Sequence, residues 1–112
     1  MTTITVFREM EGTLSGFDSQ GHTGYASAGE DIVCAAVSAL TQGTLNGLIN
    51  VLKAPVTYEI DEKDARLCVR LGDVPQDKRA GAQLLLETLV SALASVEADY
   101  PRFVRVIFKE RR

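Results

Sequence analysis

The 112-residue sequence contains no tryptophan, one histidine, two cysteines and only 6% aromatic residues. With so few aromatic side chains, no platform for stacking nucleic-acid bases stands out, and we expect no direct nucleic-acid partner. One histidine and two cysteines supply at most three zinc ligands, fewer than a structural zinc site needs. We therefore expect no metal site. Two cysteines without an export signal also do not indicate a disulfide framework.

Long apolar runs are missing as well. The longest unbroken stretches, such as Ile32 to Val37, are far shorter than the ~20 residues that a transmembrane helix needs, so we predict no membrane-spanning segment. The first residues lack the basic and apolar regions of a secretory signal, and we expect a cytoplasmic protein. Hydrophobic residues make up 46% and charged residues 24%, which is typical of soluble globular chains. The length suits a single domain over residues 1–112.

The charge is unevenly distributed. Residues 1–101 carry seven basic and fourteen acidic side chains, a net of −7, whereas residues 102–112 carry five basic and one acidic side chain, a net of +4. The basic end could contact nucleic acid or an acidic partner surface, but a solvated tail is the simpler interpretation.

Hydrophobic periodicity predicts five strands and two helices. The predicted strands are residues 2–8, 14–20, 56–60, 65–71 and 103–108, and the predicted helices are residues 30–52 and 77–98. This pattern favours an α+β fold, in which a single mostly antiparallel sheet of about five strands has two helices packed against it, in the order β-β-α-β-β-α-β.

The first predicted helix has two unusual features. Gly43 and Gly47 weaken its later turns by about 1 kcal/mol each relative to alanine, which suggests close packing there. Ala35 and Ala39 extend its apolar surface nearly all round. Burial on two sides, with a partner subunit on one of them, would explain that surface.

The most informative stretch places the only histidine, His22, in a glycine-rich loop, with Cys34 twelve residues later near a helix start. A cysteine attacks as its thiolate, which a helix N-terminus and a nearby imidazolium both favour. Ser27 and Glu30 match a capping box that starts the helix early, whereas Gly29 as the cap starts it later. The later start places Cys34 closer to the positive helix end and suits chemistry better.

Two further side chains share the helix face of Cys34. Asp31 precedes it by three residues and could orient His22 as the third member of a triad, although His22 and Cys34 could also act as a dyad. Ser38 follows it by four residues and could hydrogen-bond the thiolate or the substrate. Backbone N–H groups at the helix start and at Gly21 could stabilise an oxyanion. The simpler alternative is a small core cysteine, a surface histidine and an acid that complements the helix dipole.

The complete motif is more specific than its spacing. Gly21-His22-Thr23-Gly24-Tyr25-Ala26, followed by Gly29-Glu30-Asp31-Ile32-Val33-Cys34-Ala35-Ala36-Val37-Ser38, resembles the signature of the ribosomal-processing cysteine protease family Prp. Thr23 stands where alanine is common. The resemblance implies that His22 is the catalytic histidine and Cys34 the nucleophile. It implies supporting roles for Asp31 and Ser38, and it assigns Gly21, Gly24 and Tyr25 to a substrate loop.

The resemblance also implies a substrate. Proteases of this family remove the N-terminal extension of one large-subunit ribosomal protein, cutting after phenylalanine and before alanine, and they act as cytoplasmic homodimers without a cofactor. Phe17 or Tyr25, which lie near the motif, are candidates for an apolar pocket that holds the substrate phenylalanine.

Two other functions compete with this interpretation. One is a non-catalytic dimeric module that binds a ribosomal protein tail and keeps His22 and Cys34 as structural remnants. The other is a redox-regulated factor that forms a reversible disulfide between Cys34 and Cys68.

Overall fold

The computed structural model describes residues 1–21 and 28–111, with side chains of the first helix described from Ile32 onward. Its elements are, in chain order, β1 (Thr2–Arg8), β2 (Leu14–Gln20), α1 (Ala28–Asn46), the π-helical turn η1 (Gly47–Val51), β3 (Val56–Asp61), β4 (Arg66–Leu71), α2 (Gln76–Asp99) and β5 (Val104–Glu110). The order of strands and helices is the predicted one, with boundaries close to those expected.

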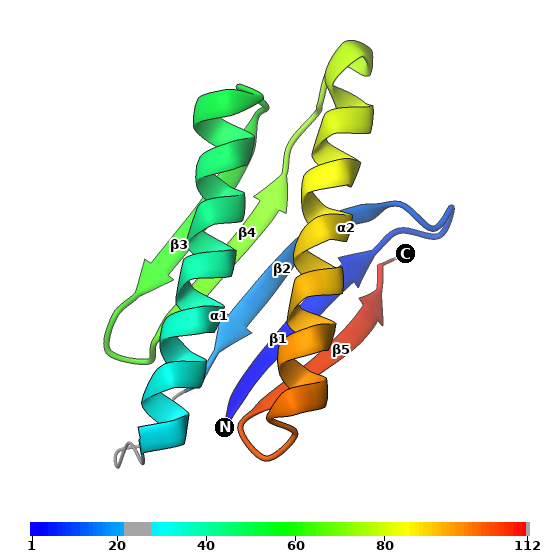
Figure 1. The fold of residues 1–112 in the computed structure, drawn as a ribbon. Helices are drawn as coiled ribbons and strands as arrows, with labels where there is room; N and C mark the ends of the chain where they lie inside the picture. The colour runs from blue at the N-terminus through cyan, green and yellow to red at the C-terminus, as the bar shows by residue number, and fades with distance from the viewer. Residues whose placement is uncertain (22–27, 112) are drawn as a thin grey trace.

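The strands form one sheet in the order β3-β4-β2-β1-β5. β1 pairs in parallel with β5, and the other neighbouring strands pair antiparallel. The predicted α+β fold is therefore confirmed, with a sheet that is mixed because α2 returns the chain to lie beside β1 in the same direction. Both helices cover the same face of the sheet, as Figure 1 shows.

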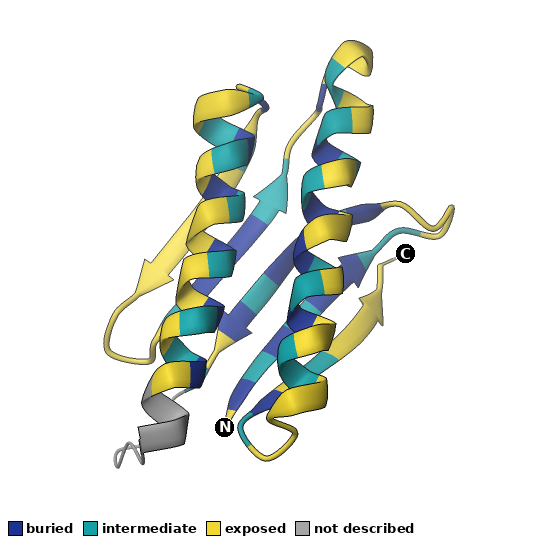
Figure 2. Cartoon of the chain, in the orientation of Figure 1, coloured by how far each residue is buried: buried dark blue, intermediate teal, exposed yellow. Residues whose placement is uncertain are grey.

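The core lies between the two helices and the covered face of the sheet (Figure 2). The side chains that fill it alternate along the strands or face inward from the helices: Ile4, Val6, Phe17, Val69, Val104, Val33, Leu48, Leu86 and Leu93, each at most 2% exposed. Phe17 is 1% exposed and pairs with Val6 and Val69. Its proposed place in a substrate pocket is therefore wrong, because the strand alternation turns it into the core.

The uncovered face of the sheet is protected by long polar side chains. The Arg70 guanidinium lies 4.2 Å from the ring centroid of Phe7, which leaves Phe7 only 6% exposed although no helix covers it. Arg66 makes two hydrogen bonds to the Asp18 carboxylate, at 3.0 and 2.8 Å. These hydrogen bonds and the charge of Asp18 raise the pKa of Arg66 above its ordinary value.

A glutamine joins α2 to β2. The Gln83 side chain accepts a hydrogen bond from the Leu14 N–H at 2.8 Å and donates one to the Leu14 carbonyl at 2.7 Å. The β1–β2 register shifts between Phe7 and Arg8, next to the pairing of Arg8 with Leu14. The side-chain amide thus replaces a strand partner for a buried backbone segment.

The last turn of the first predicted helix is wider than an α-helix. The Leu52 N–H donates to the Gly47 carbonyl at 2.9 Å, five residues back, which is the π-helical pattern. A Cβ atom on Gly47 would lie 3.3 Å from Leu85 of α2, so the predicted close packing is confirmed there. At Gly43 it is wrong, since nothing lies within 4 Å of the corresponding position.

By length and composition alone, the segment Ile32–Val51 is apolar enough to cross a membrane. The sequence prediction, which rested on unbroken apolar runs, did not identify this segment. Uncharged polar residues such as Thr41 interrupt its apolar residues but leave its mean hydropathy high. One side of the segment is part of the core, where Val33, Val37 and Leu48 are buried. The core helix of a soluble protein passes the same test.

Candidate active site

Cys34 lies on α1 where that helix passes the start of β1. It is the seventh residue of a helix that begins at Ala28, and is therefore in the second turn. The sequence left the start of this helix open between Ser27 and Gly29. With Cys34 in the second turn, the helix dipole acts on it less strongly than a first-turn position would allow. The thiol is free and partly buried. Its sulfur lies 3.9 Å from Oγ1 of Thr2, close enough for a hydrogen bond that involves sulfur.

Gly21 lies directly beside the start of β1. Its φ of +105° is in the region that favours glycine. A Cβ atom at this position would approach the Met1 carbonyl oxygen to 2.5 Å, closer than any side chain tolerates. The Gly21 carbonyl accepts a hydrogen bond of 3.2 Å from the Thr2 hydroxyl. The residue just before His22 is therefore held against the same threonine that contacts Cys34.

The other predicted site residues differ in how far the structure describes them. His22, Gly24 and Tyr25 lie outside the described residues. Asp31 belongs to α1, three residues before Cys34, and its side chain also lies outside the described part of the chain. Ser38 is exposed, one helical turn after Cys34. The roles of all five residues therefore stay predictions.

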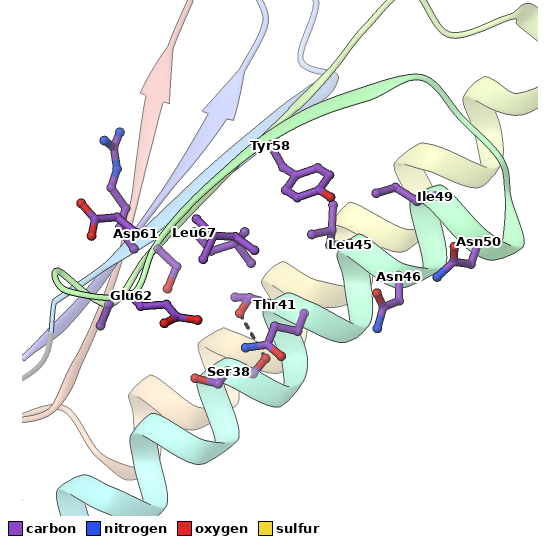
Figure 3. A pocket seen from close by; sticks show the side chains of 15 residues that line it. Ser38, Thr41, Leu45, Asn46, Ile49, Asn50, Tyr58, Asp61, Glu62 and Leu67 are labelled. Atoms are coloured by element: carbon purple, nitrogen blue, oxygen red, sulfur yellow. Dashed lines mark hydrogen bonds between the residues drawn. The ribbon is translucent and has the colours of Figure 1, made fainter.

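A groove of about 640 Å³ begins at Ser38 and follows α1 and η1 toward Asn50, with the β3–β4 hairpin as its other wall (Figure 3). Buried side chains near its floor are Ser19 of β2, Thr41 and Leu45 of α1, and Leu67 of β4. Toward the far end of the groove, apolar groups of Leu45, Ile49 and Tyr58 lie near one another (Figure 3). The groove is thus polar at the end near Cys34, and at its far end these apolar groups lie beside the amides of Asn46 and Asn50.

The charges at the hairpin wall are mostly acidic. Asp61 and Glu62 line the groove together with Arg66, whose guanidinium is occupied by Asp18. An acidic wall of this kind favours a ligand that carries basic groups.

Sequence reasoning missed Thr2 and the groove. The alternation of β1 does place Thr2 on the covered face with Ile4, but nothing in the sequence brings α1 to that point of the strand. The groove depends on how far α1 stands from the hairpin, which is a property of packing rather than of any motif.

The second cysteine has no part in this arrangement. Cys68 alternates along β4 with Leu67 and Val69, whose side chains belong to the core under the helices. Its side chain therefore points to the uncovered face, whereas Cys34 lies on the helix that covers the opposite face. Because the sheet lies between the two side chains, their sulfur atoms cannot come within bonding distance in this fold, and the hypothesis of a Cys34–Cys68 disulfide is wrong.

A thiol that is partly accessible, held beside a constrained glycine and next to a groove long enough for a peptide, fits a thiol-dependent peptidase. Comparison with known proteins gives the same class. The model of the family described as cysteine protease Prp matches residues 1–105, and the chain belongs to this family. The chain is accordingly a cysteine protease, as its resemblance to the family predicted.

Individual relatives are similar in sequence to this chain over nearly its whole length. The ribosomal processing cysteine protease Prp of Staphylococcus aureus is 28% identical over 109 residues, covering 97% of this chain and 100% of the relative. The protein of the same name from Bacillus subtilis is 29% identical over 107 residues, covering 95% of this chain and 96% of the relative.

Solved structures are similar in fold. The essential ribosomal processing protease Prp from S. aureus in complex with a substrate peptide has a TM-score of 0.87 and 27% identity, covering 97% of this chain and 100% of that one. The same enzyme with a covalently linked product peptide has a TM-score of 0.83 and 28% identity, with the same coverage. SMU.848 from Streptococcus mutans has a TM-score of 0.87 and 28% identity, covering 99% of each chain.

Proposed function

We propose that this cysteine protease removes the N-terminal extension of a large-subunit ribosomal protein in the cytoplasm, cutting after phenylalanine and before alanine. The observation that carries the proposal is the likeness, over 97% of the chain, to a ribosomal processing protease solved with a substrate peptide. The groove that begins one turn beyond Cys34 supports it, because a peptide substrate needs an extended binding surface beside the nucleophile.

In the proposed mechanism, Cys34 is the nucleophile and His22 its base. His22 takes the thiol proton, and the Cys34 sulfur attacks the scissile carbonyl to form a tetrahedral intermediate. His22 then donates that proton to the leaving amine as the C–N bond breaks, which leaves a thioester on Cys34. A water molecule that gives its proton to His22 hydrolyses the thioester, and the thiol and the acid product are released. Asp31 orients His22, and Ser38 contacts the substrate or the thiolate.

The length of the groove indicates which substrate residue would contact its far end. An α-helix rises about 1.5 Å per residue, so Leu45 lies about 16 Å along the axis from Cys34, whereas an extended peptide advances about 3.3 Å per residue. The apolar groups of Leu45, Ile49 and Tyr58 therefore contact a substrate residue about five positions from the cleaved bond. The phenylalanine at the bond itself binds near Cys34, where Tyr25 remains a candidate contact.

The decisive experiment compares wild type with Cys34→Ala and Cys68→Ala on a peptide that carries one Phe-Ala bond in an extended ribosomal tail. We expect one cut after phenylalanine, detected by mass spectrometry, from wild type and from Cys68→Ala and none from Cys34→Ala. Cys68→Ala is the matched control, because its thiol faces away from the site. Cleavage by Cys34→Ala would refute the assignment of the nucleophile. Binding without cleavage by wild type would favour the non-catalytic binding module instead.

We also infer a homodimer. The outer face of α1 leaves Ile32 61% exposed and Ala35 and Ala39 exposed beside it, and small side chains allow close approach of a second copy. Sedimentation equilibrium should give twice the chain mass for wild type and for Ser91→Glu on the exposed surface of α2. Ala39→Glu should give the mass of one chain, and a monomeric wild type would refute the inference.

A further inference from the structure

Thr2 begins β1, which lies inside the sheet between β2 and β5, and it is only 5% exposed although it carries a hydroxyl. Its backbone N–H donates to the Phe103 carbonyl at 2.8 Å, which fixes the residue against the chain that leads into β5. The hydroxyl donates to the Gly21 carbonyl at 3.2 Å and lies 3.9 Å from the Cys34 sulfur. Thr2 therefore contacts both segments that carry the proposed catalytic residues.

A threonine hydroxyl has one proton and two lone pairs. While Cys34 is a thiol, its S–H can donate to Thr2, and Thr2 can donate to Gly21, so that all three groups are satisfied in one chain of hydrogen bonds. Once Cys34 has lost its proton, the sulfur can only accept. The single proton of Thr2 can then turn from the Gly21 carbonyl to the thiolate, and a hydrogen bond to an ionised acceptor is the stronger of the two.

We infer that Thr2 is a positioning residue of the protease, whose hydroxyl proton moves between the Gly21 carbonyl and the Cys34 thiolate. The inference rests on the proposed function in one respect, since it takes Cys34 as the nucleophile. It assigns to Thr2 two effects: it stabilises the thiolate before attack, and it frees the carbonyl of the residue that precedes His22 when the thiolate forms.

The position of Gly21 makes this coupling possible. Gly21 has no side chain, so its backbone can lie against the Met1 carbonyl. At this position the carbonyl oxygen of Gly21 is within reach of the short side chain of Thr2. Thr2 thus links the approach to His22 with the helix that carries Cys34, without itself touching the scissile bond.

The test measures the rate of Cys34 alkylation by iodoacetamide as a function of pH, in a Cys68→Ala background with one reactive thiol. Thr2→Val keeps the shape of the side chain and removes the hydroxyl. It should move the midpoint of the pH dependence upward by about one pH unit, equivalent to one charge-assisted hydrogen bond. Thr2→Ser should restore the wild-type midpoint, and Thr5→Val, on the opposite face of β1, should leave it unchanged.

Every variant keeps the titratable groups of the neighbouring segments, which are His22, Glu30, Asp31 and the Met1 amino group. A difference in midpoint between variants therefore measures the effect of the Thr2 hydroxyl. An unchanged midpoint in folded Thr2→Val would overturn the inference, as would a shifted midpoint that Thr2→Ser does not restore. Folding of each variant is checked by circular dichroism.

The alkylation assay needs no peptide, so the two claims fail separately. If cleavage depends on Cys34 but Thr2→Val alkylates like wild type, only the inference about Thr2 is wrong. If Cys34→Ala cleaves the Phe-Ala peptide, the proposed function is wrong whatever the alkylation shows.

Discussion

Gly12 and Gly21 lie at opposite ends of β2. Comparing alanine substitutions at the two positions measures how much the close approach of Gly21 to β1 matters for stability and activity. Their φ angles are similar, at +95° and +105°. A Cβ atom on Gly12 meets nothing within 4 Å, whereas one on Gly21 meets the Met1 carbonyl oxygen at 2.5 Å. Replacing each with alanine therefore separates the cost of the backbone conformation from the cost of the collision.

The conformational cost of alanine at positive φ is about 1–2 kcal/mol, and the loss of freedom in the unfolded chain offsets about 0.4–1 kcal/mol of it. Gly12→Ala should therefore lower the free energy of unfolding by about 1 kcal/mol. Gly21→Ala must also move the backbone of β1 or β2, which adds about 1–3 kcal/mol. We expect a total of about 3 kcal/mol for Gly21→Ala.

Urea unfolding followed by circular dichroism measures both values. With a urea dependence of about 1–3 kcal/mol per molar, the midpoint of Gly21→Ala should lie roughly 1 M below that of Gly12→Ala. Peptide cleavage, measured where both variants are folded, should fall only in Gly21→Ala, because the displaced segment leads into His22. Equal midpoints together with equal cleavage rates would refute the reasoning.

Three further substitutions test other contacts. Gln83→Met keeps the side-chain volume but leaves the N–H and carbonyl of Leu14 without their partner, so the free energy of unfolding should fall by about 2 kcal/mol in urea titrations; an unchanged value would contradict the bridging role. Leu48→Ala removes a side chain that is 0% exposed and should cost about 3 kcal/mol by the same measurement, while the KM of the folded fraction stays unchanged. Tyr58→Ala, at a side chain that is 51% exposed, should change stability by less than ~0.5 kcal/mol and lower kcat/KM about tenfold by raising KM, whereas Thr57→Ala on the other face of β3 should change neither. Normal cleavage kinetics in Tyr58→Ala would show that the peptide does not use the far end of the groove.

Much of the fold follows from periodicity, because the strands are long enough to alternate clearly. Leu67, Val69 and Leu71 predict the covered face of β4, and the structure places Leu67 and Val69 in the core. The wide turn η1 could not be predicted, because no local pattern in the sequence distinguishes it from the end of an ordinary α-helix. The parallel pairing of β1 with β5 could not be predicted either. Strands that are distant in the chain become neighbours only through the packing of the whole sheet.

The features of the site also differ in whether a local sequence pattern encodes them. Cys34, its helix and its resemblance to a protease family are visible in the motif, and the family is confirmed by the match over residues 1–105. The sequence left the start of the helix open, because two capping arrangements overlap within three residues. The contact between Thr2 and Cys34 joins residues 32 positions apart. No local pattern encodes it, since it exists only once α1 has docked on the sheet.

The pairing of β1 with β5 also makes the site depend on residues far along the chain. Thr2 pairs with Val104, and its N–H is bound by Phe103, so the strand beneath Cys34 is completed by residues about 100 positions further along the chain. Contacts of such long sequence separation cost the most loop entropy and form slowly. Any change that frees residues 103–110 from β1 should therefore disturb the contact between Thr2 and Cys34, although none of them lies near the motif in the sequence.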